Sequence, residues 1–213
     1  MTPVLRAPAD GLRLVLVRHG QTPSNVAGLL DTLPPGPGLT EQGRRQAADL
    51  AERLGTEKVL SVHASRALRA QETALPTATR HGLDVRIADG THEIFVGDLE
   101  GRGDLDARER FDEIYDGWHH GEDRSMPGGE TGTQALTRFF ASAQPVLDEV
   151  TTGAVVLVSH GAMVRLVAAR LAPEVEPRRS SAAYLPNTGI IVLEADSASP
   201  TGWRCAQWDD LPD

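Results

Sequence analysis

The sequence predicts one α/β domain in which a largely parallel sheet carries helices on both faces. Stretches typical of buried strands alternate along the chain with stretches of helical periodicity, an order that favours parallel sheets. The length of 213 residues suffices for one sizeable core, whereas two domains would each be small. Hydrophobic residues at 40% and charged residues at 24% are ordinary for a globular protein.

The first predicted strand is the apolar run Leu14–Val17, which ends abruptly in polar side chains. A run of this kind is typical of a strand that is buried on both faces of a sheet. The residues that follow it, from Arg18 to Thr22, therefore lie where open α/β sheets bind ligands. Three prolines among the glycines of residues 28–38 predict a loop after this strand.

Helices and strands alternate over the next part of the chain. Thr40 is a suitable N-cap for a helix that Gly55 ends. The pattern then predicts a strand over residues 59–63, a helix from Arg66 to about Arg80 and a short strand over residues 85–87.

The pattern changes over residues 94–132, where several glycines interrupt a strongly charged segment. This composition predicts an excursion over the sheet with at most short helices. Excursions of this kind often serve as lids or specificity walls, and we expect that role here.

The last third of the chain returns to the alternating pattern. A helical stripe runs from Leu136 to Val150, and Pro145 should bend that helix or mark its true start. A second buried strand over residues 154–159 precedes another helix, and two strands over residues 190–193 and 203–208 complete the predicted sheet.

Two of the predicted strands end in the same dipeptide, His19–Gly20 and His160–Gly161. If these strands are neighbours, both imidazoles lie at one edge of the sheet and form a shared site. The helix after Gly161 offers free N–H groups that suit an oxyanion. Such a pocket gains two permanent positive charges and further donors from three more side chains: Arg18, Arg69 and Asn25. Its natural ligand is a phosphoryl group, because guanidinium forks match phosphate oxygens.

His19 is the candidate nucleophile of this site. Imidazole titrates near neutral pH, so a good fraction of His19 is unprotonated and nucleophilic at pH 7. Attack on phosphorus would give a phosphohistidine, and cationic side chains, including His160 if protonated, would meet the charge on the transferring group. Glu93 is the candidate proton donor to the leaving alkoxide. It must then be partly desolvated or face bound phosphate in order to hold its proton.

Short motifs follow one another in a fixed order along nearly the whole chain. They are Leu16 to Thr22 with Asn25, Ser65 with Leu68 to Ala70 and Thr73–Ala74, Glu93 with Gly97 and Leu99 to Gly101, Gly128 to Glu130, and Val158 to Gly161. Together they resemble the motifs of the histidine phosphatase superfamily, also called phosphoglycerate-mutase-like.

The resemblance implies a phosphohistidine at His19, phosphate binding by Arg18, Arg69 and His160, and a proton donor at Glu93. It also implies that Asn25 and the main chain of Gly161 complete the phosphate pocket, with Asn187 near its rim. The implied fold is a three-layer α/β/α sandwich around a mixed sheet, and the implied chemistry needs no metal or organic cofactor.

Departures from the family pattern bear on the reaction. The cofactor-dependent mutases usually carry a Trp-Asn pair after the first motif, a Glu-Arg-x-Tyr-Gly segment at the proton donor and a basic insertion. This chain has Pro23–Ser24–Asn25 where those mutases have the Trp-Asn pair. It has Glu93 to Gly97 where they have the Glu-Arg-x-Tyr-Gly segment, and the pocket wall is therefore less cationic. We therefore expect a phosphatase that passes the phosphoryl group to water. A cofactor-dependent phosphoglycerate mutase and a non-catalytic phospho-ligand binding protein remain the alternatives.

Charge and cysteine content narrow the partners and the compartment. The net charge of −9 argues against nucleic acid or an anionic membrane as a partner, so we expect a small phosphorylated metabolite. Cys205 is the only cysteine, which removes any intrachain disulfide and any cysteine-based zinc site. No stretch has the length of a signal peptide or membrane span, so the expected location is the cytoplasm. The sequence leaves the oligomeric state open.

The pair His119–His120, with Glu122 and Asp123 nearby, invites a metal interpretation. Adjacent imidazoles rarely converge on one ion without a third ligand at a fixed spacing. A solvated turn in the excursion is the preferred interpretation, and we expect no metal site.

Overall fold

The computed structural model describes residues 4–7, 9–182 and 184–209, and its centre is a mixed sheet with the strand order β3-β2-β4-β1-β5-β6. β1, β2, β3 and β4 pair in parallel, whereas β5 is antiparallel to β1 and β6 is antiparallel to β5. The prediction of a largely parallel sheet is therefore confirmed. The strands are β1 (Leu12–Arg18), β2 (Val59–Ala64), β3 (Val85–Ile87), β4 (Gly153–Ser159), β5 (Ile190–Ala195) and β6 (Trp203–Trp208).

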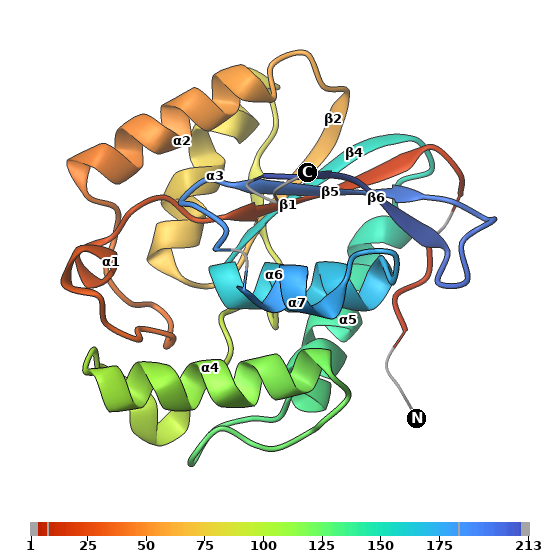
Figure 1. The fold of residues 1–213 in the computed structure, drawn as a ribbon. Helices are drawn as coiled ribbons and strands as arrows, with labels where there is room; N and C mark the ends of the chain where they lie inside the picture. Colours follow the sequence, from red (N-terminus) through yellow and green to blue (C-terminus); the bar gives the residue numbers. More distant parts are fainter. Residues whose placement is uncertain (1–3, 8, 183, 210–213) are drawn as a thin grey trace.

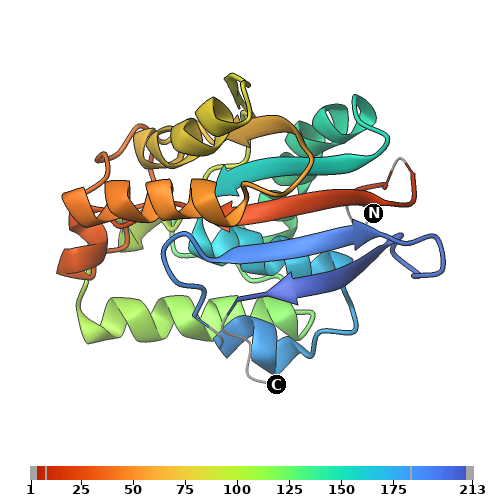
Figure 2. The ribbon, with the colours of Figure 1, turned by 90° about the horizontal axis from the view of Figure 1, so that it is seen from above.

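Helices cover both faces of this sheet and complete an α/β/α sandwich (Figures 1 and 2). α2 (Glu41–Arg53) and α3 (Leu68–Arg80) lie on one face, and α5 (Gly132–Asp148) and α6 (Gly161–Leu171) lie on the other (Figure 1). The remaining helices are α1 (Pro23–Ala27), α4 (Leu105–His119), α7 (Pro177–Ala182) and the 3-10 turn η1 (Gly97–Leu99). None of the helices in the described ranges combines the length and apolar character that crossing a bilayer requires.

The side chains of β1 divide between two cores, one on each face of the sheet. Leu14 and Leu16 pack in the core on the α5 and α6 side, while Val15 and Val17 pack in the core on the α2 and α3 side. Because both faces are buried, the strand needs apolar residues at every position, and this explains the unbroken run in the sequence.

Helix α2 packs with its backbone directly against the turn that follows β1. The Thr40 side chain caps this helix by accepting a hydrogen bond from Gly43 N. A Cβ atom at Gly43 would lie 2.2 Å from the carbonyl oxygen of Gln21, and one at Gly20 would lie 2.8 Å from that of Gly43. Only glycine allows this approach, so the main chain itself fixes the position of the turn.

The expectation of at most short helices over residues 94–132 is wrong, because α4 spans fifteen residues of that segment. Asp104 caps α4 by accepting a hydrogen bond from Ala107 N, and a buried stripe that includes Ile114 and Tyr115 holds the helix to the core. The charged side chains of α4 itself are exposed, on the solvent side of this amphipathic helix. Of the two roles predicted for Pro145, to bend the helix or to mark its start, the second is excluded because α5 begins at Gly132 and contains Pro145.

Candidate active site

Two histidines lie side by side at the carboxyl edge of the sheet. β1 and β4 are parallel neighbours in a register that pairs Arg18 with Ser159, so the next residues, His19 and His160, leave the sheet together. Their ring centroids are 5.1 Å apart. The edge contact that the two His-Gly dipeptides suggested is thus present in the structure.

A backbone hydrogen bond determines which nitrogen of His19 carries the proton. Nδ1 lies 2.7 Å from the carbonyl oxygen of Gly20, and because a carbonyl can only accept, Nδ1–H is the donor. The lone pair of the neutral ring then belongs to Nε2. Burial, followed by the charges of Arg69 and Arg18, holds the pKa of His19 well below its usual value of 6.5. His19 is therefore a neutral ring with an available nitrogen nucleophile at pH 7.

Two buried arginines surround this ring. Arg18 donates from one terminal nitrogen to the Leu185 carbonyl at 2.6 Å, and its guanidinium lies 4.6 Å from the ring centroid of Tyr184. Arg69, only 1% exposed, donates to the Asp31 carbonyl at 3.0 Å. The Nε atom of Arg18 and the other terminal nitrogen of Arg69 are buried without a hydrogen-bond partner in the described structure. Buried donors of this kind call for an acceptor, and an anion at this position would supply one.

His160 is completely buried and also has one nitrogen without a partner. Its Nε2 lies 2.8 Å from the hydroxyl of Ser65, whereas no partner is found for Nδ1 among the described residues. Burial, then the positive charge of Arg69, lowers the pKa of His160 well below 6.5. In this structure His160 is accordingly a neutral hydrogen-bonding group rather than the cation that the sequence allowed for.

The Glu93 carboxylate sits at the N-terminus of α6. One of its oxygens accepts hydrogen bonds from Ile94 N at 2.9 Å and Met163 N at 3.0 Å, and the other accepts from Ala162 N at 3.2 Å. Glu93 thus occupies the second and third N–H groups of the helix, and Gly161, the first residue, lines the cavity. The side chain is half-buried.

Asn25 lies in the short helix α1 and is connected to the main chain of His19 through a second amide. Its Oδ1 accepts hydrogen bonds from Thr22 N at 3.1 Å and from the Asn187 side chain at 3.2 Å. The same Asn187 amide donates to the carbonyl of His19 at 3.0 Å. The two asparagines therefore connect α1 to the main chain of His19.

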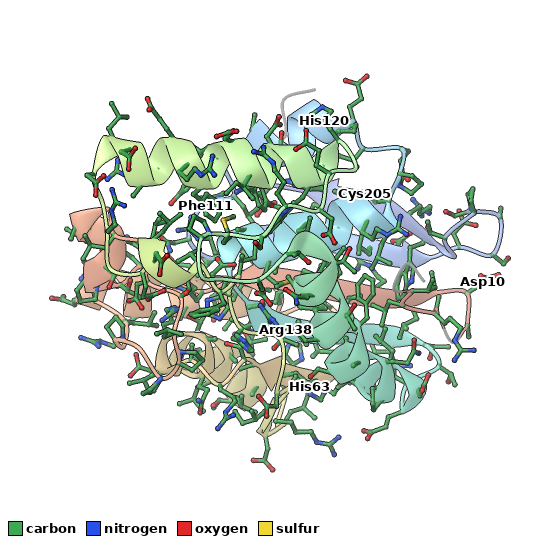
Figure 3. All side chains as sticks on the ribbon, turned by 90° about the horizontal axis from the view of Figure 1, so that it is seen from below. Asp10, His63, Phe111, His120, Arg138 and Cys205 are labelled. Atoms are coloured by element: carbon green, nitrogen blue, oxygen red, sulfur yellow. The ribbon has the colours of Figure 1, made fainter. Side chains whose placement is uncertain are left out.

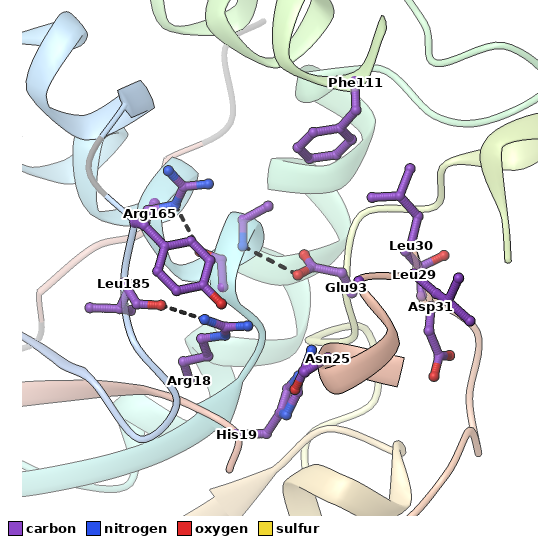
Figure 4. Close-up of a pocket in the computed structure, with 15 residues that line it drawn as sticks. Arg18, His19, Asn25, Leu29, Leu30, Asp31, Glu93, Phe111, Arg165 and Leu185 are labelled. Atoms are coloured by element: carbon purple, nitrogen blue, oxygen red, sulfur yellow. Dashed lines mark hydrogen bonds between the residues drawn. The ribbon is translucent and has the colours of Figure 1, made fainter. Parts of the chain in front are cut away.

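These groups open into a cavity of about 240 Å³ (Figure 4). Of the predicted site residues, Arg69 and His160 lie behind its wall, and those that line it are Arg18, His19, Asn25, Glu93 and Gly161. Sequence reasoning missed the other ten lining residues, and the four of these with charged or aromatic side chains are Asp31, Phe111, Arg165 and Tyr184. They come from a loop, from α4, from α6 and from the segment before β5, and no short motif connects them in the sequence.

The histidine pair at the end of α4 lies outside this cavity. His119 Nδ1 is 2.9 Å from the Ser180 hydroxyl, and His120 Nδ1 is 3.0 Å from the Asp116 carbonyl. Within the described ranges, no group of three or more His, Cys, Asp or Glu side chains is placed to hold a metal ion.

Comparison with known proteins gives a consistent set of relatives. The family model of the histidine phosphatase superfamily, branch 1, matches residues 14–210. A glucosyl-3-phosphoglycerate phosphatase of Mycobacterium tuberculosis is 33% identical over 75% of this chain and 74% of its own length. A metal-independent phosphoserine phosphatase of Arabidopsis thaliana is 29% identical over 97% of this chain and 85% of its own. A 2,3-bisphosphoglycerate-dependent phosphoglycerate mutase of Azorhizobium caulinodans is 35% identical over 81% of this chain and 89% of its own length.

The fold has equally clear counterparts among solved structures. A mycobacterial glucosyl-3-phosphoglycerate phosphatase in complex with VO3 superposes with a TM-score of 0.75 and 28% identity, covering 92% of this chain and 98% of the other. A PE-PGRS family protein of Mycobacterium tuberculosis is 42% identical over 85 residues, but this chain spans only 15% of that protein's length.

Proposed function

Because the chain belongs to the histidine phosphatase superfamily, we propose that it hydrolyses a phosphomonoester through a covalent phosphohistidine at His19. The observation that carries the proposal is the hydrogen bond from Nδ1–H of His19 to the Gly20 carbonyl, which leaves Nε2 as the free nucleophile. Named phosphatases among its relatives support the same reaction class.

The first half-reaction transfers the phosphoryl group to His19. The Nε2 lone pair forms a bond to phosphorus while the ester P–O bond breaks, and a proton from Glu93 converts the leaving oxygen to an alcohol. Arg18 and Arg69 meet the charge on the transferring oxygens with buried N–H groups that have no hydrogen-bond partner in the described structure; the Arg69 nitrogen also forms an ion pair with Asp31 at 3.7 Å.

The second half-reaction returns the enzyme to its starting state. Glu93, now a carboxylate, takes a proton from water as the water oxygen attacks phosphorus and the P–N bond breaks. Inorganic phosphate leaves, and His19 recovers its neutral ring with the proton on Nδ1.

The cavity favours a small substrate with one phosphoryl group. Its volume of about 240 Å³ is below the roughly 300–1,000 Å³ of pockets that hold drug-sized ligands. Among the described lining residues, Arg18 and Arg165 are the cations, and Asp31 and Glu93 are anions. A second phosphate would meet too little positive charge, and this disfavours the mutase alternative. Leu29, Leu30 and Phe111 give the alcohol half of the substrate an apolar wall.

Rapid-quench labelling with phosphorylated substrates tests the proposal. Wild-type protein should form an acid-labile phosphoenzyme and release phosphate from a panel of phosphomonoesters, and His19→Ala should do neither. Bisphosphoglycerate-stimulated interconversion of monophosphates that outruns hydrolysis would establish the mutase instead. Phosphate binding without turnover across the panel would establish a non-catalytic binding protein.

We also place this activity in the cytoplasm. A lone cysteine and an acidic net charge suit a metabolite phosphatase in a reducing compartment. Fractionation of cells that carry the tagged protein tests the location.

A further inference from the structure

One sequence motif, Gly128 to Glu130, has no part in the reaction described above. The Glu130 carboxylate of this motif forms a bidentate ion pair with Arg138 of α5. The Arg138 Nε donates to Oε2 at 2.9 Å, and a terminal nitrogen donates to Oε1 at 2.6 Å. The two side chains are only 13% and 20% exposed. Figure 3 shows Arg138 on the face of the sheet that α5 covers. A shielded, two-pronged pair holds a more definite geometry than an exposed one.

The other hydrogen bonds of Arg138 go to the main chain around Glu93. Arg138 donates to the carbonyl oxygens of Gly90 at 2.6 Å, His92 at 2.9 Å and Glu93 itself at 2.8 Å. Together with the two bonds to Glu130, every nitrogen of the guanidinium is engaged. The segment that precedes Glu93 in the chain is thereby fixed to α5.

Glu130 holds the segment on the other side of Glu93. Its Oε1 accepts a hydrogen bond from Phe95 N at 2.8 Å, and its own N–H donates to the Phe95 carbonyl at 3.0 Å. A Cβ atom at Gly97 would lie 2.2 Å from the carbonyl oxygen of Pro127. The backbone around Gly97 therefore packs directly against the backbone around Pro127. The main chain is therefore anchored both before and after the proton donor.

We propose that Glu130 and Arg138 are positioning residues that set the place of the Glu93 carboxyl relative to the leaving oxygen. Neither lines the cavity, so they act through Glu93 and not on the substrate. Proton transfer requires hydrogen-bond distance, and a displacement of about 1 Å costs on the order of 100-fold in rate. This inference rests on the proposed function, because it assigns Glu93 the proton-transfer role.

The test compares two substrates that differ in their need for a proton. In the first half-reaction the leaving group of an alkyl phosphate such as phosphoserine is an alkoxide, which needs a proton from Glu93. The leaving group of p-nitrophenyl phosphate is a stabilised phenolate, which departs without that proton. We expect Arg138→Lys and Glu130→Gln to lower kcat/KM for the alkyl ester by about 10- to 100-fold and kcat/KM for the aryl ester by less than about 3-fold. The comparison uses kcat/KM because this ratio reports the steps up to phosphoryl transfer to His19, whereas kcat also contains the hydrolysis of the phosphohistidine, which needs Glu93 with either substrate. Glu93→Gln should show the same selectivity.

A double variant and a matched control complete the experiment. In the Glu93→Gln background, Arg138→Lys should cause no further loss with the alkyl ester, because the group it positions is already gone. Arg80→Lys and Glu52→Gln alter an exposed Arg–Glu pair on the opposite face, at 2.6 Å, and should leave both substrates unaffected. Circular dichroism of every variant establishes that it is folded. The experiment uses Arg138→Lys in place of Arg138→Ala because lysine keeps the positive charge.

Equal losses with both substrates, losses that add to that of Glu93→Gln, or no loss at all would overturn the positioning role while leaving the hydrolase intact. Wild-type protein that turns over neither ester would overturn the proposed function, and the positioning role with it.

Discussion

The imidazole of His19 meets that of His160 edge to face, with 62° between the ring planes. Burial and neighbouring arginine charge lower the pKa of both rings, so the pair is neutral and the fixed positive charge next to the rings is that of Arg18 and Arg69. A bound phosphoryl dianion therefore meets two permanent cations and a nucleophile that needs no deprotonation. The site can act without first removing a proton from its nucleophile.

The protonation state of His19 can be observed directly. Nitrogen-15 NMR of the free protein should show the Nδ1–H form, with a titration midpoint well below 6.5. Arg69→Met should raise that midpoint, because the Arg69 charge opposes protonation of the ring. A midpoint at or above 6.5 in the wild type, or a proton on Nε2 in its neutral form, would contradict the assignment.

Loss of either buried arginine should remove most of the activity. We expect Arg69→Met and Arg18→Met each to lower kcat/KM by about 100- to 1,000-fold, since each removes a preorganised donor to the transferring oxygens. Arg66→Met is a matched control three residues before Arg69, because Arg66 is exposed and faces Asp89 at 3.4 Å. Steady-state kinetics on one substrate measures these losses. Equal losses of kcat/KM in Arg66→Met and Arg69→Met would contradict a role for Arg69 in the site.

Helix α2 supplies a prediction whose sign opposes helix propensity. Gly43→Ala should gain up to about 1 kcal/mol from propensity in an ordinary helix. Here the new Cβ would lie 2.2 Å from the Gln21 carbonyl, and the turn after His19 must shift to admit it. Urea unfolding should show a net loss of stability together with reduced kcat, and a stabilised, fully active variant would refute the close packing.

His63 should make stability depend on pH. It is buried in β2, and burial lowers its pKa to about 4. Below about pH 6.5, His63 binds a proton in the unfolded chain but stays neutral in the folded protein. The free energy of unfolding therefore falls as the pH drops from 6.5 towards 4. His63→Asn should remove about 2 to 3 kcal/mol of the difference between the unfolding free energies at pH 7.5 and 4.5. Identical pH profiles for the two proteins would rule out this contribution.

The parts of the site that the sequence revealed are those carried by regular strands. His19 and His160 follow apolar runs that are typical of buried strands, and the glycine after each indicates a tight turn at the sheet edge. The structure adds that the two strands are neighbours. Asp31, Phe111 and Arg165 gave no such signal, because their convergence depends on how a proline-rich loop, α4 and α6 pack together. Helix α4 was missed because glycines and charges obscured its apolar stripe.

The register that pairs Arg18 with Ser159 separates the chemistry of this protein from its selectivity. The nucleophile and its partner histidine are fixed by a ladder of main-chain hydrogen bonds, which side-chain replacements elsewhere do not alter. The cavity walls that the alcohol half of the proposed substrate would face include Leu30, Phe111 and Tyr184, which lie outside the strands. Evolution or design could exchange these walls to reach new phosphate esters while the reaction centre stays unchanged.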